Sequence, residues 1–190
     1  MAADVINWDN IPKPPEDRRA EHITGTALPP VCLTSTDGVE INLADLRGTS
    51  VIYAYPLMSR PDVAPPEGWE NIPGAKGCTP QSCAYRDHYQ DLKTAGADNI
   101  FGLSVQDTDY QREAVARLHL PFPLLSDSDY MLTRVISLPT TQVEGRYLLN
   151  RLTMLLEDNE IVKIHYPVYP PDQDAENVLN WLQNKKDTPC

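Results

Sequence analysis

Short apolar runs that alternate with helical stretches limit the fold of this chain more than any other feature. Residues 50–55 and 99–105 are rich in β-forming side chains and have the composition of buried strands. Residues 79–96 and 108–120 separate these runs from one another and from a third run at 122–126, and they repeat apolar side chains at helical spacing. Strands that alternate with helices predict an α/β fold with a mixed central β-sheet flanked by helices.

Both ends of this α/β unit carry further signals. An Asp-Gly pair at residues 37–38 divides an alternating apolar segment and predicts an N-terminal β-hairpin. Residues 151–156 and 161–166 predict a second hairpin, and residues 175–186 a final amphipathic helix. The expected order is therefore a hairpin, then β, α, β, α, β, a short helix, a hairpin and a helix.

The 190 residues suit one domain with a proper core, and we find no internal repeat. Residues 1–27 are polar and hold three prolines, so we expect an N-terminal arm with a short helix near residues 16–22. The predicted domain covers residues 28–186, and residues 187–190 form a C-terminal tail.

The charge of the chain makes two classes of partner poor candidates. The formal net charge is -11 and the pI about 4.7, so neither nucleic acid nor an anionic membrane surface is expected to bind. The sequence has no apolar run of the roughly 18–20 residues that a membrane span needs. The N-terminal residues lack the pattern of a secretory signal, and a cytoplasmic location is expected.

Two of the four cysteines, Cys78 and Cys83, lie close together at the predicted start of a helix. Thr79 is expected to cap this helix, and Pro80 suits its first position because proline has no amide proton to leave unpaired. The free amide groups and positive dipole end of a helix N-terminus favour a thiolate. Cys78 is therefore the candidate nucleophile.

The spacing of these two cysteines restricts how they can react with each other. Five residues along a regular helix place two Cα atoms about 8.7 Å apart, whereas a disulfide needs roughly 4.4–6.8 Å. The two thiols either never meet or form a redox switch in which the helix unwinds locally. The spacing matches neither a zinc site nor a thioredoxin C-x-x-C motif, and no metal site is expected.

A long loop at residues 59–77 precedes Cys78 and holds four prolines and three glycines. Loops of this length inside a compact domain are uncommon and are often functional. Trp69 either anchors this loop in the core or forms one wall of a substrate pocket. Of the remaining cysteines, Cys32 is expected to pack in a strand, and Cys190 to be exposed and incidental.

The segment Pro-Gly-x-x-Gly-Cys-Thr-Pro-Gln-Ser-Cys-x-x-Arg-Asp, residues 73–87, resembles the active-site segment of Q-type peroxiredoxins, the bacterioferritin-comigratory group of the AhpC/TSA superfamily. Segments at residues 28–48, 101–104 and 123–127 resemble this family as well, and the similarity covers roughly residues 25–185. It implies a thioredoxin-like fold and a thiol peroxidase that needs no cofactor.

The resemblance also implies a role for each site residue. Cys78 is the peroxidatic cysteine, Cys83 resolves its sulfenic acid through an intramolecular disulfide, and Arg151 lies near the reactive sulfur; Arg146 competes for the last role. The substrates are hydrogen peroxide and organic hydroperoxides, and a thioredoxin-like or glutaredoxin-like protein is the reductant. A monomer or a homodimer is expected.

The chain departs from the family where a hydroxyl normally binds the peroxide. In the usual pattern, Pro-x-x-x-Thr/Ser-x-x-Cys, three residues separate the proline from the hydroxyl residue and two separate that residue from the cysteine. Here the long loop separates Pro56 and Ser59 from Cys78. Ser59 can fold back to the site, or Thr79 can replace it. This long-loop variant leaves three alternatives open: an enzyme for one particular organic hydroperoxide or other metabolite in a specialised pathway, a redox sensor, and a thiol–disulfide exchange enzyme.

Overall fold

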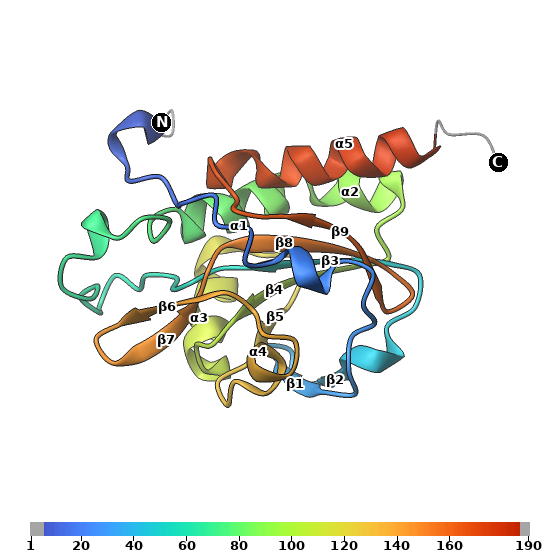
Figure 1. Cartoon of the computed structure of the whole chain (residues 1–190), viewed down its shortest axis with the longest axis horizontal. Coiled ribbons are helices and arrows are strands. Elements are labelled where there is room, and N and C mark those ends of the chain that lie inside the picture. Colours follow the sequence, from blue (N-terminus) through green and yellow to red (C-terminus); the bar gives the residue numbers. More distant parts are fainter. Residues whose placement is uncertain (1–5, 187–190) are drawn as a thin grey trace.

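A seven-stranded mixed β-sheet forms the centre of the computed structural model, which describes residues 6–186 (Figure 1). Its strand order is β2-β1-β5-β4-β3-β8-β9. The strands are β1 (Cys32–Ser35), β2 (Glu40–Asn42), β3 (Thr49–Ala54), β4 (Asn99–Ser104), β5 (Leu124–Ser126), β8 (Leu152–Glu157) and β9 (Glu160–His165). Strands β3, β4 and β5 are parallel, and the remaining pairs are antiparallel. The predicted mixed sheet and both predicted hairpins are confirmed.

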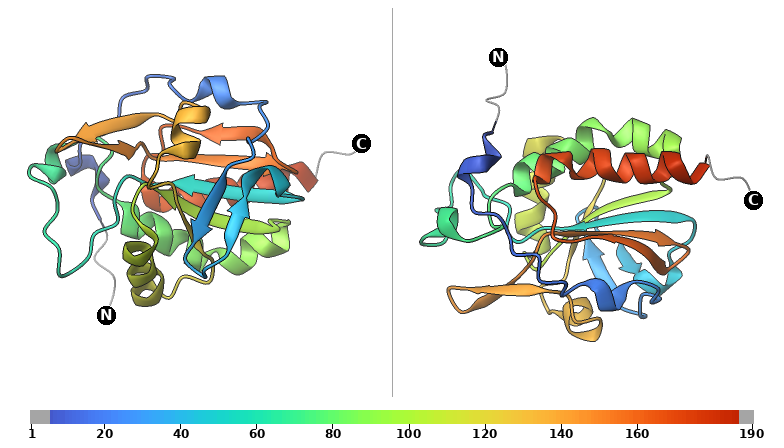
Figure 2. Two further views of the ribbon diagram at one scale, coloured as in Figure 1. Left: turned by 90° about the horizontal axis from the view of Figure 1, so that it is seen from below. Right: turned by 45° about the horizontal axis from the view of Figure 1, so that its top comes forward.

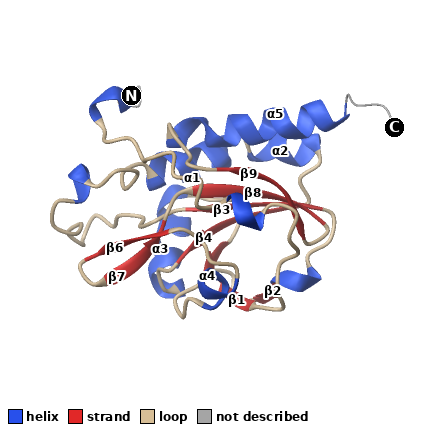
Figure 3. Ribbon diagram, viewed as in Figure 1, coloured by secondary structure: helices blue, strands red, loops and turns tan. Residues whose placement is uncertain are grey.

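Helices lie on both sides of the strands (Figure 3), and most of them share one apolar core. Helices α1 (Cys78–Asp87), α2 (Tyr89–Ala95), α3 (Thr108–Leu118) and α5 (Asp174–Lys186) contribute side chains to a core that includes Val51, Tyr53 and Tyr55 of the β3 segment. Ile52 and Ala54 point to the opposite face, where they share an apolar core with Leu132 of the short helix α4 (Met131–Val135). The alternation along β3 therefore separates two apolar layers.

The structure adds a third hairpin that the sequence interpretation missed. Strands β6 (Thr140–Val143) and β7 (Arg146–Leu149) pair in a two-stranded sheet of their own. Both residues of the connecting turn have positive φ, 47° at Glu144 and 77° at Gly145, which is the type I′ geometry of tight hairpins. The Glu-Gly pair was the available signal, but it is weaker than the usual Asn-Gly or Asp-Gly.

The N-terminal arm lies against the domain (Figure 2). Trp8 and Ala20 are buried, and an isolated antiparallel bridge joins Ala27 to Glu160. The short helix expected near residues 16–22 forms only as one 3-10 turn, Glu21–Ile23; Arg18 has a left-handed backbone with φ of 59°, which prevents a longer right-handed helix. The proposed domain boundaries stay predictions, and the predicted tail at 187–190 lies outside the described residues. Within residues 6–186 no helix combines the length and apolar character that crossing a bilayer requires.

Candidate active site

Cys78 is the first residue of α1 and only 4% exposed. The expected cap is wrong: Gly77, not Thr79, precedes the helix, with a left-handed φ of 112°. A Cβ atom at this position would lie 2.3 Å from Cγ of Pro171 and 3.0 Å from the ring of Trp8. Both the backbone conformation and the packing therefore require glycine at position 77. This glycine allows the helix to begin at Cys78 itself.

Arg151 lies immediately before β8 and places its guanidinium against this thiol. Its side chain is buried, and Nη2 lies 3.4 Å from Sγ of Cys78. The same nitrogen contacts the carbonyl oxygens of Gly74, Ala75 and Lys76 at 3.3, 3.2 and 3.1 Å. The cation thus holds the end of the long loop and the sulfur together. The competitor Arg146 is exposed on β7 and does not take this place.

A chain of buried polar groups continues behind Arg151. Its Nη1 donates to Oε1 of Gln81 at 2.6 Å, and Nε2 of Gln81 donates to Oδ2 of Asp174 at 2.8 Å. Gln81 and Asp174 are both fully buried. The sequence interpretation missed these two residues; Gln81 lies one helical turn after Cys78, on the same side of the helix, and that spacing was the only available signal.

Cys83 lies on the same helix in a half-buried position. Burial raises the pKa of its thiol, while the nearby Arg86 acts in the opposite direction. Cys78 and Cys83 are both free thiols. Regular helix geometry keeps their Cα atoms about 8.7 Å apart, so the structure represents a state in which the disulfide has not formed.

A cavity of about 650 Å³ opens on Cys78 and brings four of the six predicted site residues together. Besides Cys78, its lining includes Ser59, Thr79 and Trp69. Ser59 is exposed and Thr79 is partly buried. Most other lining residues are apolar; Ile6, Trp8 and Ile11 come from the arm, Pro65 and Pro66 from the long loop, and Leu57 lies just before that loop. The two segments that depart most from the family pattern therefore build the surroundings of the thiol.

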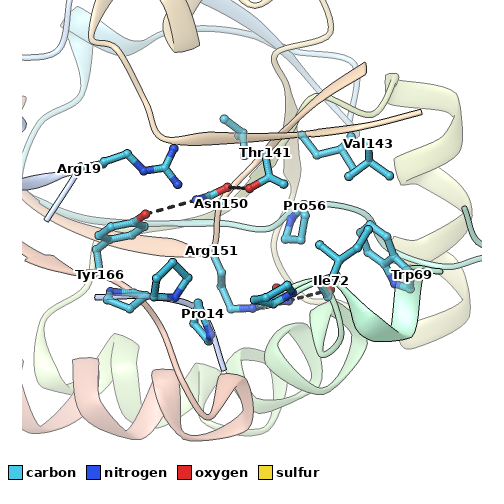
Figure 4. Close-up of a pocket in the computed structure, with 17 residues that line it drawn as sticks. Pro14, Arg19, Pro56, Trp69, Ile72, Thr141, Val143, Asn150, Arg151 and Tyr166 are labelled. Carbon is cyan, nitrogen blue, oxygen red and sulfur yellow. Dashed lines mark hydrogen bonds between the residues drawn. The ribbon is translucent and has the colours of Figure 1, made fainter. Parts of the chain in front are cut away.

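Trp69 anchors the long loop and also lines a cavity, whose binding of substrate stays a prediction. Its ring is buried in a small apolar cluster with Ala75, Val143 and Leu148, and it lines the cavity over Cys78. It also borders a second cavity of about 210 Å³ on the other side of the loop. Figure 4 shows Trp69, Ile72 and Val143 on one side of this second cavity and Arg19 and Tyr166 on the other.

Cys32 lies outside this site. Cys32 is exposed at the start of β1, so the expectation that it packs in the core is wrong. The alternation of β1 directs Leu33 and Ser35 inward and leaves Cys32 on the outer side. Cys190 lies outside the described residues.

A buried cysteine at a helix N-terminus, with an arginine at its sulfur and a mixed sheet behind it, is an arrangement suited to a thiol nucleophile. Residues 23–179 match the Redoxin family. The chain is 30% identical to a chloroplastic peroxiredoxin Q of Gentiana triflora over 162 residues, 84% of this chain and 66% of that protein. It is 29% identical to the chloroplastic peroxiredoxin Q of Sedum lineare over 85% of this chain and 78% of that protein.

Solved structures share the fold. The peroxidoxin BcpB of Mycobacterium tuberculosis superimposes with a TM-score of 0.68 at 20% identity, over 85% of this chain and 96% of that one. The chain belongs to the redoxin family, as a peroxiredoxin of the Q type.

Proposed function

We propose that this enzyme reduces hydroperoxides with Cys78 as the nucleophile, Arg151 as the residue that stabilises the charge, and Cys83 as the resolving thiol. The observation that carries the proposal is the 3.4 Å contact between Nη2 of Arg151 and Sγ of Cys78. An arginine stays charged at any physiological pH and offers a rigid set of donors. It can therefore stabilise negative charge at the reacting atoms and polarise a peroxide that approaches the sulfur.

In the first step the Cys78 thiolate attacks the terminal oxygen of the hydroperoxide. The O–O bond breaks, the sulfur becomes a sulfenic acid, and the released alkoxide or hydroxide takes up a proton to leave as an alcohol or water. Arg151 stabilises the negative charge as it moves from sulfur to the leaving oxygen. A hydroxyl from Ser59 or Thr79, which both line the cavity, is suited to bind the peroxide.

In the second step Cys83 attacks the sulfenic acid, water leaves, and a disulfide joins the two sulfurs. The first turns of α1 must unwind, because the helix holds the two Cα atoms beyond disulfide reach. A dithiol reductant of the thioredoxin or glutaredoxin type then reduces the disulfide by exchange and becomes oxidised itself. This cycle returns both thiols.

Stopped-flow oxidation by hydrogen peroxide, followed by mass spectrometry, tests these roles. The wild type is expected to react fast and to end with a Cys78–Cys83 disulfide. Cys78→Ser should abolish the fast reaction, whereas Cys83→Ser should keep it and stop at the sulfenic acid. If the wild type and Cys78→Ser reacted equally slowly, the proposal that Cys78 reduces hydroperoxides would be wrong.

The cavity over Cys78 favours a second, narrower candidate: an enzyme for bulky organic hydroperoxides. Hydrogen peroxide is little larger than water, yet the cavity has about 650 Å³ and a mainly apolar lining. Burial of the apolar part of a substrate there contributes about 25 cal/mol per Å². The arm residue Trp8, whose Nε1 donates to Asp172 at 2.8 Å, forms a fixed part of this wall.

The narrower candidate is tested with two peroxides and one truncated side chain. Trp8→Ala should lower kcat/KM for cumene hydroperoxide about tenfold, because one aromatic wall is lost, and leave kcat/KM for hydrogen peroxide nearly unchanged. Trp181→Ala, on α5 and outside the cavity lining, is the matched control. Equal losses for both peroxides would show that Trp8 supports the structure and does not select the substrate.

A further inference from the structure

One buried carboxylate takes no part in the two steps above, yet it holds the helix that carries both cysteines. Asp174 begins α5, and its side chain is fully buried. Its Oδ2 accepts hydrogen bonds from Nε2 of Gln81 at 2.8 Å, the hydroxyl of Tyr85 at 2.9 Å and Oγ1 of Thr153 at 2.6 Å. Its Oδ1 lies 2.8 Å from Nδ1 of His165. The carboxylate is therefore bound at both oxygens, with three hydrogen bonds at Oδ2 and one at Oδ1.

The two α1 residues that Asp174 binds lie on either side of Cys83. Gln81 precedes this cysteine by two residues, Tyr85 follows it by two, and both are fully buried. The ring of Tyr85 also stacks on Tyr53 with centroids 4.3 Å apart. While both bonds to Asp174 persist, the segment between the two cysteines stays in its helical conformation.

Disulfide formation requires the segment between the two cysteines to leave its helical conformation. The Cα atoms must approach from about 8.7 Å to within roughly 6.8 Å, and Gln81 lies inside the segment that has to rearrange. Its bonds to Asp174 and Arg151 must break before Cys83 can reach the sulfenic acid. We infer that Asp174 is a positioning residue that keeps α1 wound during peroxide reduction and sets how fast the disulfide forms. This inference rests on the proposed function.

The sulfenic acid has two fates, and their ratio reports how long α1 stays wound. If Cys83 arrives, its thiol displaces water and a disulfide forms. If a second hydroperoxide arrives first, one of its oxygens is transferred to the sulfur, an alcohol or water leaves, and Cys78 becomes a sulfinic acid. Firm binding of Gln81 and Tyr85 by Asp174 lengthens the interval in which the second reaction can occur. The yield of sulfinic acid per turnover is therefore the quantity to measure.

Asp174→Asn tests this inference because it preserves the shape of the side chain and removes its charge. Hydrogen bonds to a neutral amide are weaker than those to a carboxylate. During turnover with hydrogen peroxide and dithiothreitol, the sulfinic yield per turnover is expected to fall about tenfold. Amide hydrogen exchange in α1 should accelerate by a similar factor.

A second buried aspartate provides the matched control. Asp127 is 2% exposed and accepts hydrogen bonds from the backbone amides of Leu132 and Thr133 and from the Thr133 hydroxyl. These bonds hold α4, which carries neither cysteine. Asp127→Asn should accelerate exchange in α4 and leave the sulfinic yield at the wild-type value, which separates a general loss of stability from an effect on α1.

Tyr85→Phe is the second test variant and keeps the inference testable if Asp174→Asn does not fold. It removes one of the bonds to Asp174 and leaves Gln81 in place, so a smaller fall in sulfinic yield is expected. An unchanged yield in the variants, with a wild type that turns over normally, would overturn the role of Asp174 alone. A wild type that forms no sulfenic acid at Cys78 would overturn the proposed function as well.

Discussion

The two cysteines of α1 are held in different ways, although five residues separate them. Cys78 is 4% exposed, and groups from other parts of the chain surround its sulfur: Arg151 at 3.4 Å and the carbonyl oxygen of Ala75 at 3.7 Å. Cys83 is half-buried and packs at the margin of the core. Its charged neighbour Arg86 is bound to Asp87 and to the backbone of α3.

This difference follows from what each thiol has to do. The first thiol must lie still against the cation, because catalysis depends on donors that are already in position when the charge moves. The second must travel, so its position in the folded helix matters less than the ease with which that helix unwinds. One helix can meet both needs because its first turn is bound to Arg151 and Asp174, while Cys83 faces partly toward solvent.

Removal of the Arg151 guanidinium next to Cys78 is expected to have the largest effect, on the rate of Cys78 oxidation. Arg151→Met keeps an apolar stem and loses every donor that reaches Cys78. The rate constant for oxidation of Cys78 should fall about 10²–10³-fold, the usual cost of losing a positioned electrostatic donor. Stopped-flow fluorescence with hydrogen peroxide measures it, and circular dichroism verifies the fold.

Arg146→Met is the control for this comparison. Arg146 is exposed on β7 and five residues away in sequence, so its loss changes the net charge equally without touching the sulfur. Its rate constant should stay within about twofold of the wild type, because surface charges contribute little. Similar losses in both variants would mean that Cys78 responds to net charge and not to the contact with Arg151.

An intermediate effect is expected at the face of α1 that points into the core. The hydroxyl of Tyr53 donates to Oγ of Ser82 at 2.9 Å, and both residues are fully buried. Tyr53→Phe should destabilise the protein by about 1 kcal/mol, a fall in Tm of about 2–4 °C, and leave Cys78 oxidation nearly unchanged. Tyr147→Phe is the control, since Tyr147 is 53% exposed. A large loss of activity in Tyr53→Phe would show that the core side of α1 also positions the reactive thiol.

The layers of the fold were predictable because they depend on local patterns. The central strand at residues 50–55 is a continuous apolar run, and its structural counterpart β3 is buried at almost every position. The hairpin of β6 and β7 was missed because most of its residues are polar and partly exposed, so no apolar alternation marks it. Cys32 was misjudged because an alternating strand has two possible phases, and only the packed structure decides which side is inner.

The site was predictable only in part, because some of its residues carry a local sequence signal and others are brought together only by the fold. Cys78 and Cys83 carry a local signal in their spacing, and Arg151 was placed by resemblance to a family. Asp174 carries no signal in the sequence: it lies 93 residues from Gln81, and its burial follows from the packing of α5 on α1. The arm likewise looked featureless, yet Ile6, Trp8 and Ile11 line the cavity over the thiol.

The smallest expected effect separates the half-buried thiol of Cys83 from the exposed thiol of Cys32. Burial raises the pKa of Cys83, so a smaller fraction is thiolate at pH 8 than for an ordinary thiol near 8.5. Because only the thiolate reacts, iodoacetamide should alkylate Cys83 several-fold more slowly than the exposed Cys32 at pH 8. As pH rises, the Cys83 rate should keep increasing after an ordinary thiol has levelled off. Quenched labelling and peptide mass spectrometry measure both rates in one sample. Equal rates at pH 8 would mean that α1 already opens around Cys83 in the reduced protein, and the contrast between its two cysteines would then hold for Cys78 alone.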